Sequence, residues 1–188
     1  MKYSIETLLA DANPKQYLFF WGHRPSKDGS ITKTCFSQWW ESDFTVNGIT
    51  YRSAEHWMMA KKASLFNDAE VLEKILACTS PAEAKKLGRE VKNYDDALWL
   101  EHRYAIVKEG NYHKFSQSTA LKEFLLSTGS SIIVEASPVD PVWGIGLPAD
   151  SPKAANPETW RGLNLLGFAL MEVRDILTTD NRQPITKN

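Results

Sequence analysis

The stretch that organises this chain is Tyr51-Arg52-Ser53-Ala54-Glu55-His56-Trp57-Met58-Met59-Ala60-Lys61-Lys62-Ala63, which we predict to be a strand end leading directly into a helix. Ser53 is a favourable N-cap, because its hydroxyl can accept a hydrogen bond from an unpaired N–H group of the first turn. Glu55 then lies in that turn, where the helix dipole stabilises a carboxylate. Glu55 and Lys62 return to nearly the same face, about 10 Å apart along the axis, and a long lysine side chain leans toward the helix N-terminus. The spacing predicts an acid/base and an amine on one pocket wall; the alternative is a solvated Glu and Lys on an amphipathic helix.

Strands are predicted on both sides of this helix. Asn47-Gly48 separates two strand-like runs and supplies the positive φ angles of a tight type I′ hairpin turn. Earlier in the chain, the apolar and aromatic run Tyr17-Leu18-Phe19-Phe20-Trp21 predicts a buried strand. Ile132-Ile133-Val134 predicts another short strand.

Helical spacing and capping residues predict several further helices. We expect them after Asp68, from Ser80-Pro81 to Gly88, from Asp95 or Asp96 toward Phe115, from Ser118 toward Gly129, and from Asn164 to Leu177. Residues 1–14 are predicted to form a short helix or arm, and residues 179–188 a polar, disordered tail. The fold class is therefore α+β and mostly α-helical, with a small antiparallel sheet at the Asn47-Gly48 hairpin.

Size and composition suit one globular domain. The chain has 188 residues, of which 43% are hydrophobic and 24% charged. Its formal net charge of −1 excludes a global field that would attract nucleic acid or an anionic membrane, although a local basic patch would be compatible with it. Two separated cysteines, no signal peptide and no long apolar span predict a reducing cytoplasm without a membrane partner. The four scattered histidines predict no metal site.

A second candidate stretch is Asp140-Pro141-Val142-Trp143-Gly144-Ile145-Gly146. Its glycines would let a backbone approach a flat ring while Trp143 stacks on that ring. Asp140 would stand beside the stack as an acceptor or base. The alternative is an Asp-Pro turn with a buried tryptophan.

Three more positions are candidates for contacts with an anionic ligand. Backbone N–H groups at the helix start after Trp160 could bind a phosphate, and Asn164 a ribose or base edge; alternatively, Asn164 only caps the helix. Arg24, just after a strand, is either a phosphate hook or an exposed loop arginine. Lys114, at the end of the long helix, is expected to complement the helix dipole.

The ordered motifs of the chain together resemble the NADAR family, also called the YbiA-like family, over about residues 17–177. The motifs that carry the resemblance are Glu55-His56-Trp57, Ser80-Pro81, Lys86-Leu87-Gly88-Arg89, Trp99, Lys114-Phe115-x-Gln117, Asp140-x-x-Trp143-Gly144-x-Gly146 and Gly162-x-Asn164-x-x-Gly167. The resemblance implies one domain of that fold over residues 15–178. A departure is Ser37-Gln38-Trp39, where the family often has Ser-Asn-Phe or Ser-Asn-Trp, so the longer Gln38 would shift the pocket.

The resemblance also implies an activity, cleavage of an N-glycosidic bond between a ribose carbon and an exocyclic amine. The substrate would be a ribosylamino-pyrimidine intermediate of riboflavin synthesis, or ADP-ribosylated guanine in nucleic acid, including single strands. Glu55 matches the catalytic glutamate, Lys62 the lysine that attacks the anomeric carbon, and Asp140 is a further catalytic candidate. The implied substrate-binding positions are Gly22, Arg24, Gln38, Trp39, Trp99, Trp143, Gly144 and Asn164.

This chemistry agrees with the residues. A Schiff base on Lys62 requires a lysine with a lowered pKa, which partial burial could supply. Glu55 would shuttle the proton, and neither a metal nor an organic cofactor is needed. A monomer is expected. The alternatives are a non-catalytic ADP-ribose or nucleotide reader and a plain structural domain.

Overall fold

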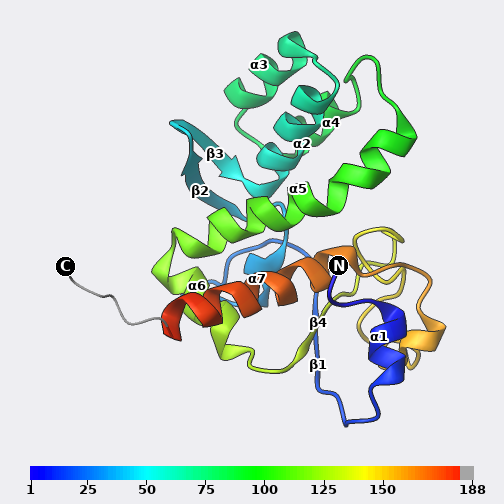
Figure 1. Cartoon of the computed structure of the whole chain (residues 1–188). Coiled ribbons are helices and arrows are strands. Elements are labelled where there is room, and N and C mark those ends of the chain that lie inside the picture. The colour runs from blue at the N-terminus through cyan, green and yellow to red at the C-terminus, as the bar shows by residue number, and fades with distance from the viewer. Residues whose placement is uncertain (183–188) are drawn as a thin grey trace. The chain divides into compact units, whose positions relative to one another are not determined.

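The chain folds into two compact units, which are described separately. The central unit is Ser37–Ser118, and the terminal unit combines Met1–Phe36 with the chain from Thr119 onward. The computed structural model describes residues 1–182. Helices dominate both units, and the strands of this described part form two small sheets (Figure 1), so the predicted mostly α-helical α+β class is confirmed.

The central unit begins with the predicted hairpin. Strand β2 (Glu41–Val46) pairs antiparallel with β3 (Ile49–Ser53), and Val46 lies opposite Ile49. At the turn, Asn47 has φ 51° and Gly48 φ 79°, the positive angles that a two-residue type I′ turn requires. The hairpin prediction is confirmed.

Helix α2 (Ala54–Leu65) follows β3 directly, as predicted. Ser53 is extended and its Oγ accepts a hydrogen bond from the backbone N–H of His56, which is the expected N-cap. Residues 54–60 are all buried. The helix therefore runs through the core of the central unit instead of presenting one solvated face, as a surface amphipathic helix would.

Trp57 is the centre of the packing around α2. Its ring is fully buried and lies 5.0 Å from the Tyr51 ring and 6.1 Å from the Phe44 ring. The indole N–H donates to the carbonyl of Ile106 on α5 (Asp96–Ser116). A Cβ at Gly110 of α5 would lie 2.4 Å from the Trp57 ring, so the absence of a side chain there allows α5 to approach α2.

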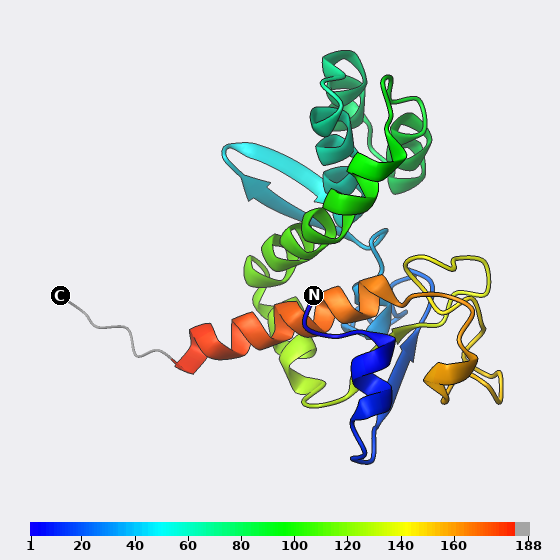
Figure 2. The ribbon, with the colours of Figure 1, turned by 45° about the vertical axis from the view of Figure 1, so that its right-hand side comes forward.

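Two short helices complete the central unit beside α2 (Figure 2). Helix α3 (Ala69–Ala77) is capped by Asp68, and α4 (Pro81–Gly88) by Ser80 with proline at its start. These caps and the end of α4 at Gly88 were predicted. A Cβ at Gly88 would lie only 2.0 Å from Sδ of Met59, so this glycine lets α4 approach α2 closely.

The terminal unit contains a sheet that the sequence did not predict. Strands β1 (Tyr17–Phe20) and β4 (Ile132–Glu135) were both expected, but they pair with one another in parallel. The pairing runs from Tyr17 opposite Ile132 to Phe20 opposite Glu135. The prediction of a small antiparallel sheet therefore describes the central unit alone.

Helix α7 (Leu165–Arg182) packs against β4 and is the long helix of the terminal unit. It continues through Arg182 instead of ending at Leu177, so the predicted helix end was wrong; residues 183–188 of the predicted tail lie outside the described chain. Arg174 of α7 is buried and donates to the Thr128 hydroxyl and the Ser131 carbonyl. These bonds connect α7 to the segment between α6 (Thr119–Ser127) and β4.

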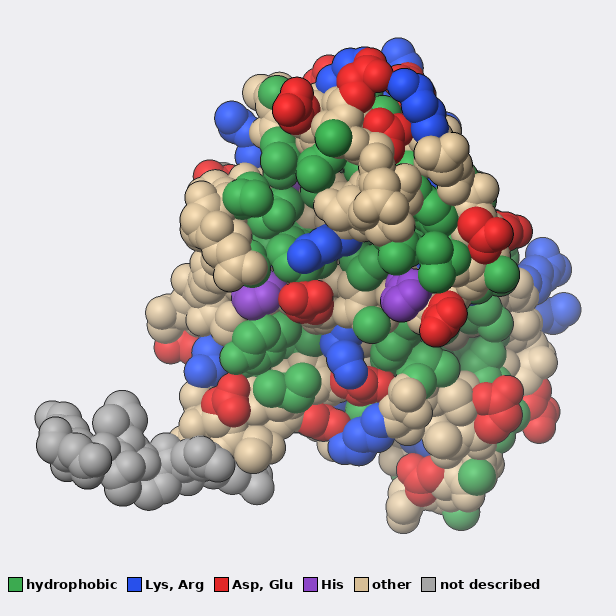
Figure 3. Space-filling view, turned by 45° about the horizontal axis from the view of Figure 1, so that its top comes forward, with side chains coloured by type: hydrophobic (Ala, Val, Ile, Leu, Met, Phe, Trp, Pro, Cys, Tyr) green, Lys and Arg blue, Asp and Glu red, His purple; other side chains and the backbone are tan. Residues whose placement is uncertain are grey.

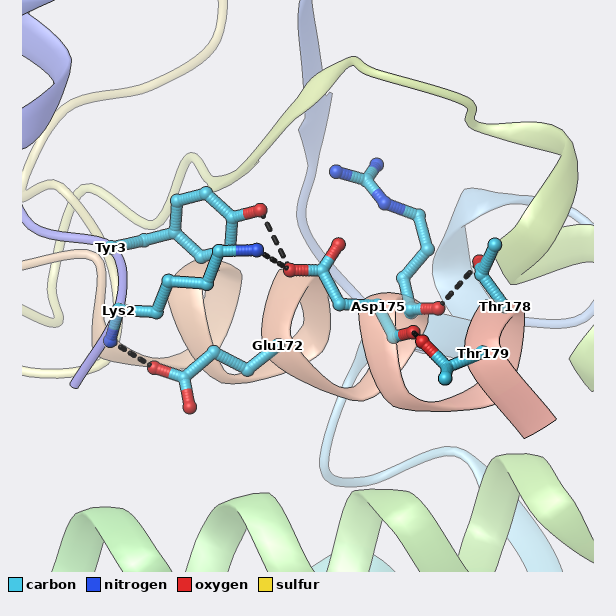
Figure 4. A network of polar contacts seen from close by, with 7 residues as sticks. Lys2, Tyr3, Glu172, Asp175, Thr178 and Thr179 are labelled. Atoms are coloured by element: carbon cyan, nitrogen blue, oxygen red, sulfur yellow. Dashed lines mark hydrogen bonds and ion pairs between the residues drawn. The ribbon is translucent and has the colours of Figure 1, made fainter.

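The N-terminal segment also lies on α7 (Figure 4). The backbone N–H of Lys2 donates to Glu172, and the Tyr3 hydroxyl donates to Asp175 at 2.8 Å. The Lys2 ammonium forms an ion pair with the same Asp175 carboxylate. The chain then forms α1 (Ile5–Ala10), whose Leu8 is buried, so the predicted short helix is present.

Candidate functional site

The predicted site residues fall into two groups, one on each unit. Gln38, Trp39, Glu55, Lys62 and Trp99 belong to the central unit. The second group belongs to the terminal unit and comprises Gly22, Arg24, Asp140, Trp143, Gly144 and Asn164.

Glu55 is the buried carboxylate of the central group. It occupies the first turn of α2, as predicted, and only 2% of its surface is exposed. Its backbone N–H donates to the carbonyl of Gln38 at 2.9 Å, so the segment before β2 lies against the start of α2. The burial excludes the alternative of a solvated glutamate.

His56 lies next to Glu55 and is also buried. Its Nδ1 is 2.8 Å from the Ser53 hydroxyl, and burial lowers its pKa. The ring is therefore held neutral in the core, where it fixes Ser53, the residue that caps α2.

Gln38, the residue that departs from the family pattern, is held by α5. Its Oε1 accepts a hydrogen bond from Nδ2 of Asn111, which also donates to the Val107 carbonyl. Because Asn111 must turn its amide nitrogen toward Val107, the orientation of both side chains follows from the network. Gln38 Nε2 and Asn111 Oδ1 are buried and find no hydrogen-bond partner among residues 1–182. Asn111 was not predicted, since nothing in the local sequence indicates its contact with Gln38.

Lys62 lies at the last turn of α2, on the side that faces α4 and the start of α5. Its Nζ donates to the Gly88 carbonyl at 2.8 Å and lies 4.4 Å from the Tyr94 ring and 5.7 Å from the Trp99 ring. Partial burial lowers its pKa, as the Schiff-base chemistry requires. The structure does bring Trp99 to Lys62. The predicted lean of the lysine toward Glu55 stays a prediction, and these tertiary contacts were not predicted.

Two more side chains of the central unit complete this group. Trp39 is half-buried, with Nζ of Lys85 on α4 5.7 Å from its ring. Lys114 lies in the last turn of α5, as expected, but it is almost fully buried and donates to the Ser37 carbonyl. Its ammonium thus holds the segment that carries Gln38 and Trp39. This contact was not predicted, because the sequence indicated only that Lys114 complements the helix dipole.

The terminal group lies at the carboxyl ends of β1 and β4. Because these strands are parallel and in register up to Phe20 and Glu135, the loops that follow them leave the same end of the sheet. Gly22, with φ 81°, and Arg24 are exposed in the first loop, and Asp140 and Trp143 lie in the second. Ligands of parallel sheets commonly bind at this end, so the topology brings the predicted phosphate hook and stacking residue to one end of the sheet.

Asp140 organises its own loop. One carboxylate oxygen accepts the backbone N–H groups of Val142 at 2.9 Å and Trp143 at 2.8 Å. This matches the Asp-Pro turn alternative, except that Trp143 is only half-buried. A Cβ at Gly144 would lie 2.7 Å from the Glu135 carbonyl oxygen, so the glycine is required for contact with β4, a different reason from the ring approach that we predicted.

Asn164 and the start of α7 differ most from the prediction. Asn164 is fully buried, with φ 53°, and its amide accepts from the Glu135 N–H and donates to the Ile133 carbonyl, each at 3.0 Å. The backbone N–H groups of Leu165 and Leu166 donate to the carbonyls of Val142 and Trp143. The predicted phosphate site at this helix start is wrong, because the 141–144 loop already occupies those donors. The Asn164 side chain also does not cap α7, since it bonds to β4.

Other features of the described chain bear on the kind of site. Lys, Arg, Asp and Glu side chains are interspersed on the face in Figure 3. Among residues 1–182, there is no group of three His, Cys, Asp or Glu arranged to hold a metal ion. In the same range, every helix is too short or too polar to cross a bilayer. A cavity of about 470 Å³ lies in the terminal unit beside Lys2, Arg174 and Asp175, and none of the predicted site residues lines it.

Comparisons with known proteins cover nearly the whole chain. The family model of the NADAR domain matches residues 19–178. An N-glycosidase of Acanthamoeba polyphaga mimivirus is 43% identical over 165 residues, which are 85% of this chain and 95% of the relative. A riboflavin biosynthesis protein of Vibrio vulnificus is 34% identical over 133 residues, which are 71% of this chain and 32% of that relative.

A solved structure has the same fold. The NMR structure of the Escherichia coli protein YbiA matches with a TM-score of 0.71 and covers 94% of each chain. The two sequences are 24% identical. The match includes elements of both units.

Proposed function

The chain belongs to the NADAR domain family, and we propose that it is an N-glycosidase that hydrolyses the C–N bond between a ribose carbon and an exocyclic amine. The name of the viral relative, an N-glycosidase at 43% identity, supports this reaction class. The observation that carries the proposal is on α2, where one helix holds a buried carboxyl group, Glu55, and an amine, Lys62, whose pKa burial lowers.

The proposed reaction uses both groups. The ribosylamine opens to an imine at the anomeric carbon, and the neutral Lys62 amine adds to that carbon. Glu55 delivers a proton to the exocyclic amine, which leaves and is replaced by a Schiff base between Lys62 and the sugar. Water then hydrolyses the Schiff base, so that the products are the free sugar and the free amine.

The terminal unit holds a second set of candidate ligand-binding residues. In this proposal Trp143 stacks on a base and Arg24 binds a phosphate, since both lie at the carboxyl end of the β1–β4 pair. Asp140 uses one carboxylate oxygen for its own turn, and its other oxygen is the one proposed as a base. The cytoplasmic location and the monomeric state stay predictions from the sequence.

Two substrate classes are proposed, ADP-ribosylated guanine in nucleic acid and a ribosylamino-pyrimidine of riboflavin synthesis. The name of the Vibrio vulnificus relative supports the second. The test is to incubate the protein with an ADP-ribosylated guanine oligonucleotide and, separately, with the ribosylamino-pyrimidines, and to detect the released sugar by mass spectrometry. Release from either substrate, abolished in Glu55→Gln, is the expected result. Tight binding of ADP-ribose without release from any substrate would instead identify a nucleotide reader.

A further inference from the structure

The amine of Lys62 lies between a carbonyl group and two aromatic rings. One of these rings belongs to Tyr94, which none of the sequence motifs includes. The Nζ atom is 4.4 Å from the centre of the Tyr94 ring, nearer than to the Trp99 ring at 5.7 Å. The Gly88 carbonyl accepts a hydrogen bond from the same atom at 2.8 Å. These contacts fix an otherwise flexible four-carbon side chain at its charged end.

The position of the Gly88 carbonyl follows from the packing of α4 on α2. Because any Cβ at residue 88 would collide with Met59, the glycine is what allows the end of α4 to lie against α2. Met59 is three residues before Lys62, so this close contact also brings the Gly88 carbonyl within reach of the amine. The hydrogen bond to the Gly88 carbonyl restricts the Lys62 amine in one direction only, so the Tyr94 and Trp99 rings must restrict its movement in the others.

Tyr94 is itself held firmly by its surroundings. Its hydroxyl donates to Asp96 at 2.7 Å, and this hydrogen bond raises the pKa of Tyr94 to about 12. Its ring lies 5.2 Å from the ring of Phe66, the C-cap of α2. The preceding residue, Asn93, has φ 55°, an angle that asparagine tolerates better than most residues.

The loop that carries Tyr94 is anchored at a second point. The buried carboxylate of Asp68 accepts the backbone N–H of Lys92 at 2.9 Å with one oxygen and caps α3 through Val71 with the other. The position of the Tyr94 ring is therefore fixed by a contact before it, at Lys92, and by a contact after it, at Asp96. At 44% exposure, Tyr94 covers Lys62 on one side and meets solvent on the other.

We propose that Tyr94 is a positioning residue that, together with the Gly88 carbonyl, holds the Lys62 amine at the place from which it attacks the sugar. This inference rests on the proposed function, in which Lys62 is the nucleophile. An aromatic face attracts an ammonium group without forming a directional bond, and the same ring limits by its bulk the directions open to the amine once it is neutral. Effective attack requires alignment, and a displacement of about 1 Å can lower a rate by about 10²-fold.

Lys61 provides an internal comparison. Its Nζ also lies 4.4 Å from an aromatic ring, that of Trp57, but within residues 1–182 it donates no hydrogen bond to a carbonyl. If a ring contact alone were sufficient for positioning, both lysines would respond alike to a probe of amine reactivity. The combination of ring and carbonyl distinguishes Lys62.

The test compares Tyr94→Leu, which removes the ring, with Tyr94→Phe, which keeps it and loses only the bond to Asp96. Two quantities are measured: kcat and KM on an N-glycoside, and reductive labelling of lysines by glyceraldehyde and cyanoborohydride. Labelling is carried out at alkaline pH, where lysine amines are largely neutral, and Lys61 and Lys62 are quantified by peptide mass mapping. A melting curve of each variant accompanies both measurements.

Tyr94→Leu should lower kcat by about tenfold or more with a much smaller change in KM. Labelling of Lys62 should rise as its cover is removed, while labelling of Lys61 stays constant, and Tyr94→Phe should retain most of the turnover. Unchanged kcat in Tyr94→Leu, or an equal loss in Tyr94→Phe, would overturn the inference. So would a joint rise in labelling of both lysines with a lower melting temperature, which indicates local unfolding.

The labelling result separates this inference from the proposed function. If the wild-type protein cleaves no N-glycoside offered to it, the proposed function fails, but the aldehyde still reports where the amine is held. A selective rise at Lys62 in Tyr94→Leu would then uphold the positioning role of Tyr94. Equal labelling in the wild-type protein and in Tyr94→Leu would overturn it.

Discussion

At the scale of single residues, Glu55 combines two features that suit a group that gives and takes a proton. It is buried, at 2% exposure, which favours the neutral carboxyl group, and it lies in the first turn of a helix, which favours the carboxylate. In the proposed reaction, the same residue serves as acid and base.

Replacement of Glu55 by glutamine tests this role. Glu55→Gln keeps the shape of the side chain but cannot transfer a proton, so turnover should fall by about 10²-fold or more with folding and ligand binding retained. Turnover, a binding isotherm and a melting curve measure these effects. Glu73→Gln, on the exposed side of α3, is the matched control and should be neutral. Near-normal turnover in Glu55→Gln would assign the proton transfer to Asp140.

The pKa of Lys62 gives a prediction for the pH dependence of the reaction. Burial lowers this pKa from its usual value of 10.5, so the neutral amine becomes abundant at a lower pH than in a free lysine. The rate of Schiff-base formation should therefore rise with pH, and the midpoint of this rise should lie at a pH below 10.5. The pH profile of single-turnover adduct formation measures this. A rising limb centred at or above 10.5 would contradict the assignment of Lys62 as the nucleophile.

The sequence predicted those residue positions that depend on near neighbours. Ser53 as the cap, Glu55 in the first turn and Asn47-Gly48 at the hairpin follow from local chemistry, and the structure confirms them. The contacts of the Lys62 amine with Gly88 and Tyr94 were not predicted, because these two residues come from other parts of the chain. Contacts between elements far apart in the sequence cannot be read from helical spacing alone.

At the scale of secondary-structure elements, Asn164 acts as a connection between α7 and β4. Its side-chain amide replaces a neighbouring strand for part of β4, because it pairs with the Glu135 N–H and the Ile133 carbonyl. Gly167 permits this contact, since a Cβ there would lie 2.1 Å from the Ile133 oxygen. The stretch that we predicted to bind substrate thus has a clear role in stability.

Substitution of Asn164 separates that role from ligand binding. Asn164→Ala leaves a buried N–H and a buried carbonyl unpaired, and should lower the free energy of unfolding by about 1–3 kcal/mol. Asn164→Gly is the matched control, because glycine tolerates the positive φ and isolates the lost hydrogen bonds from backbone strain. Chemical denaturation of both variants measures the effect. Unchanged stability with weaker substrate binding would restore the predicted ligand contact.

Long-range pairing explains what the sequence could not predict at this scale. Both strands of the β1–β4 sheet were recognisable from their apolar runs, but their partners lie far apart in the chain, Tyr17 opposite Ile132. No turn motif connects them, unlike Asn47-Gly48 in the hairpin. The parallel register, which places the Arg24 and Asp140 loops at one end of the sheet, is therefore a finding of the structure.

At the scale of the whole molecule, the charge limits how a nucleic-acid substrate can bind. The formal net charge is −1, and charges of both signs mix on the face shown in Figure 3. We therefore expect the protein to contact few phosphates. A plot of log kcat/KM against log salt concentration for an ADP-ribosylated oligonucleotide should then have a slope no steeper than about −3. A small ribosylamine substrate is the control. A steeper slope would indicate an extended electrostatic contact with the nucleic-acid backbone.

The most direct test of the proposed mechanism is to trap the sugar on the enzyme during turnover. Borohydride added to the reacting enzyme should reduce the Schiff base, and peptide mapping should place the sugar adduct on Lys62. Lys62→Arg should abolish both trapping and most turnover, because a guanidinium stays protonated and does not attack readily, whereas Lys61→Arg should have little effect. An adduct on Lys61, or full activity in Lys62→Arg, would contradict the account and mean that water attacks the sugar directly.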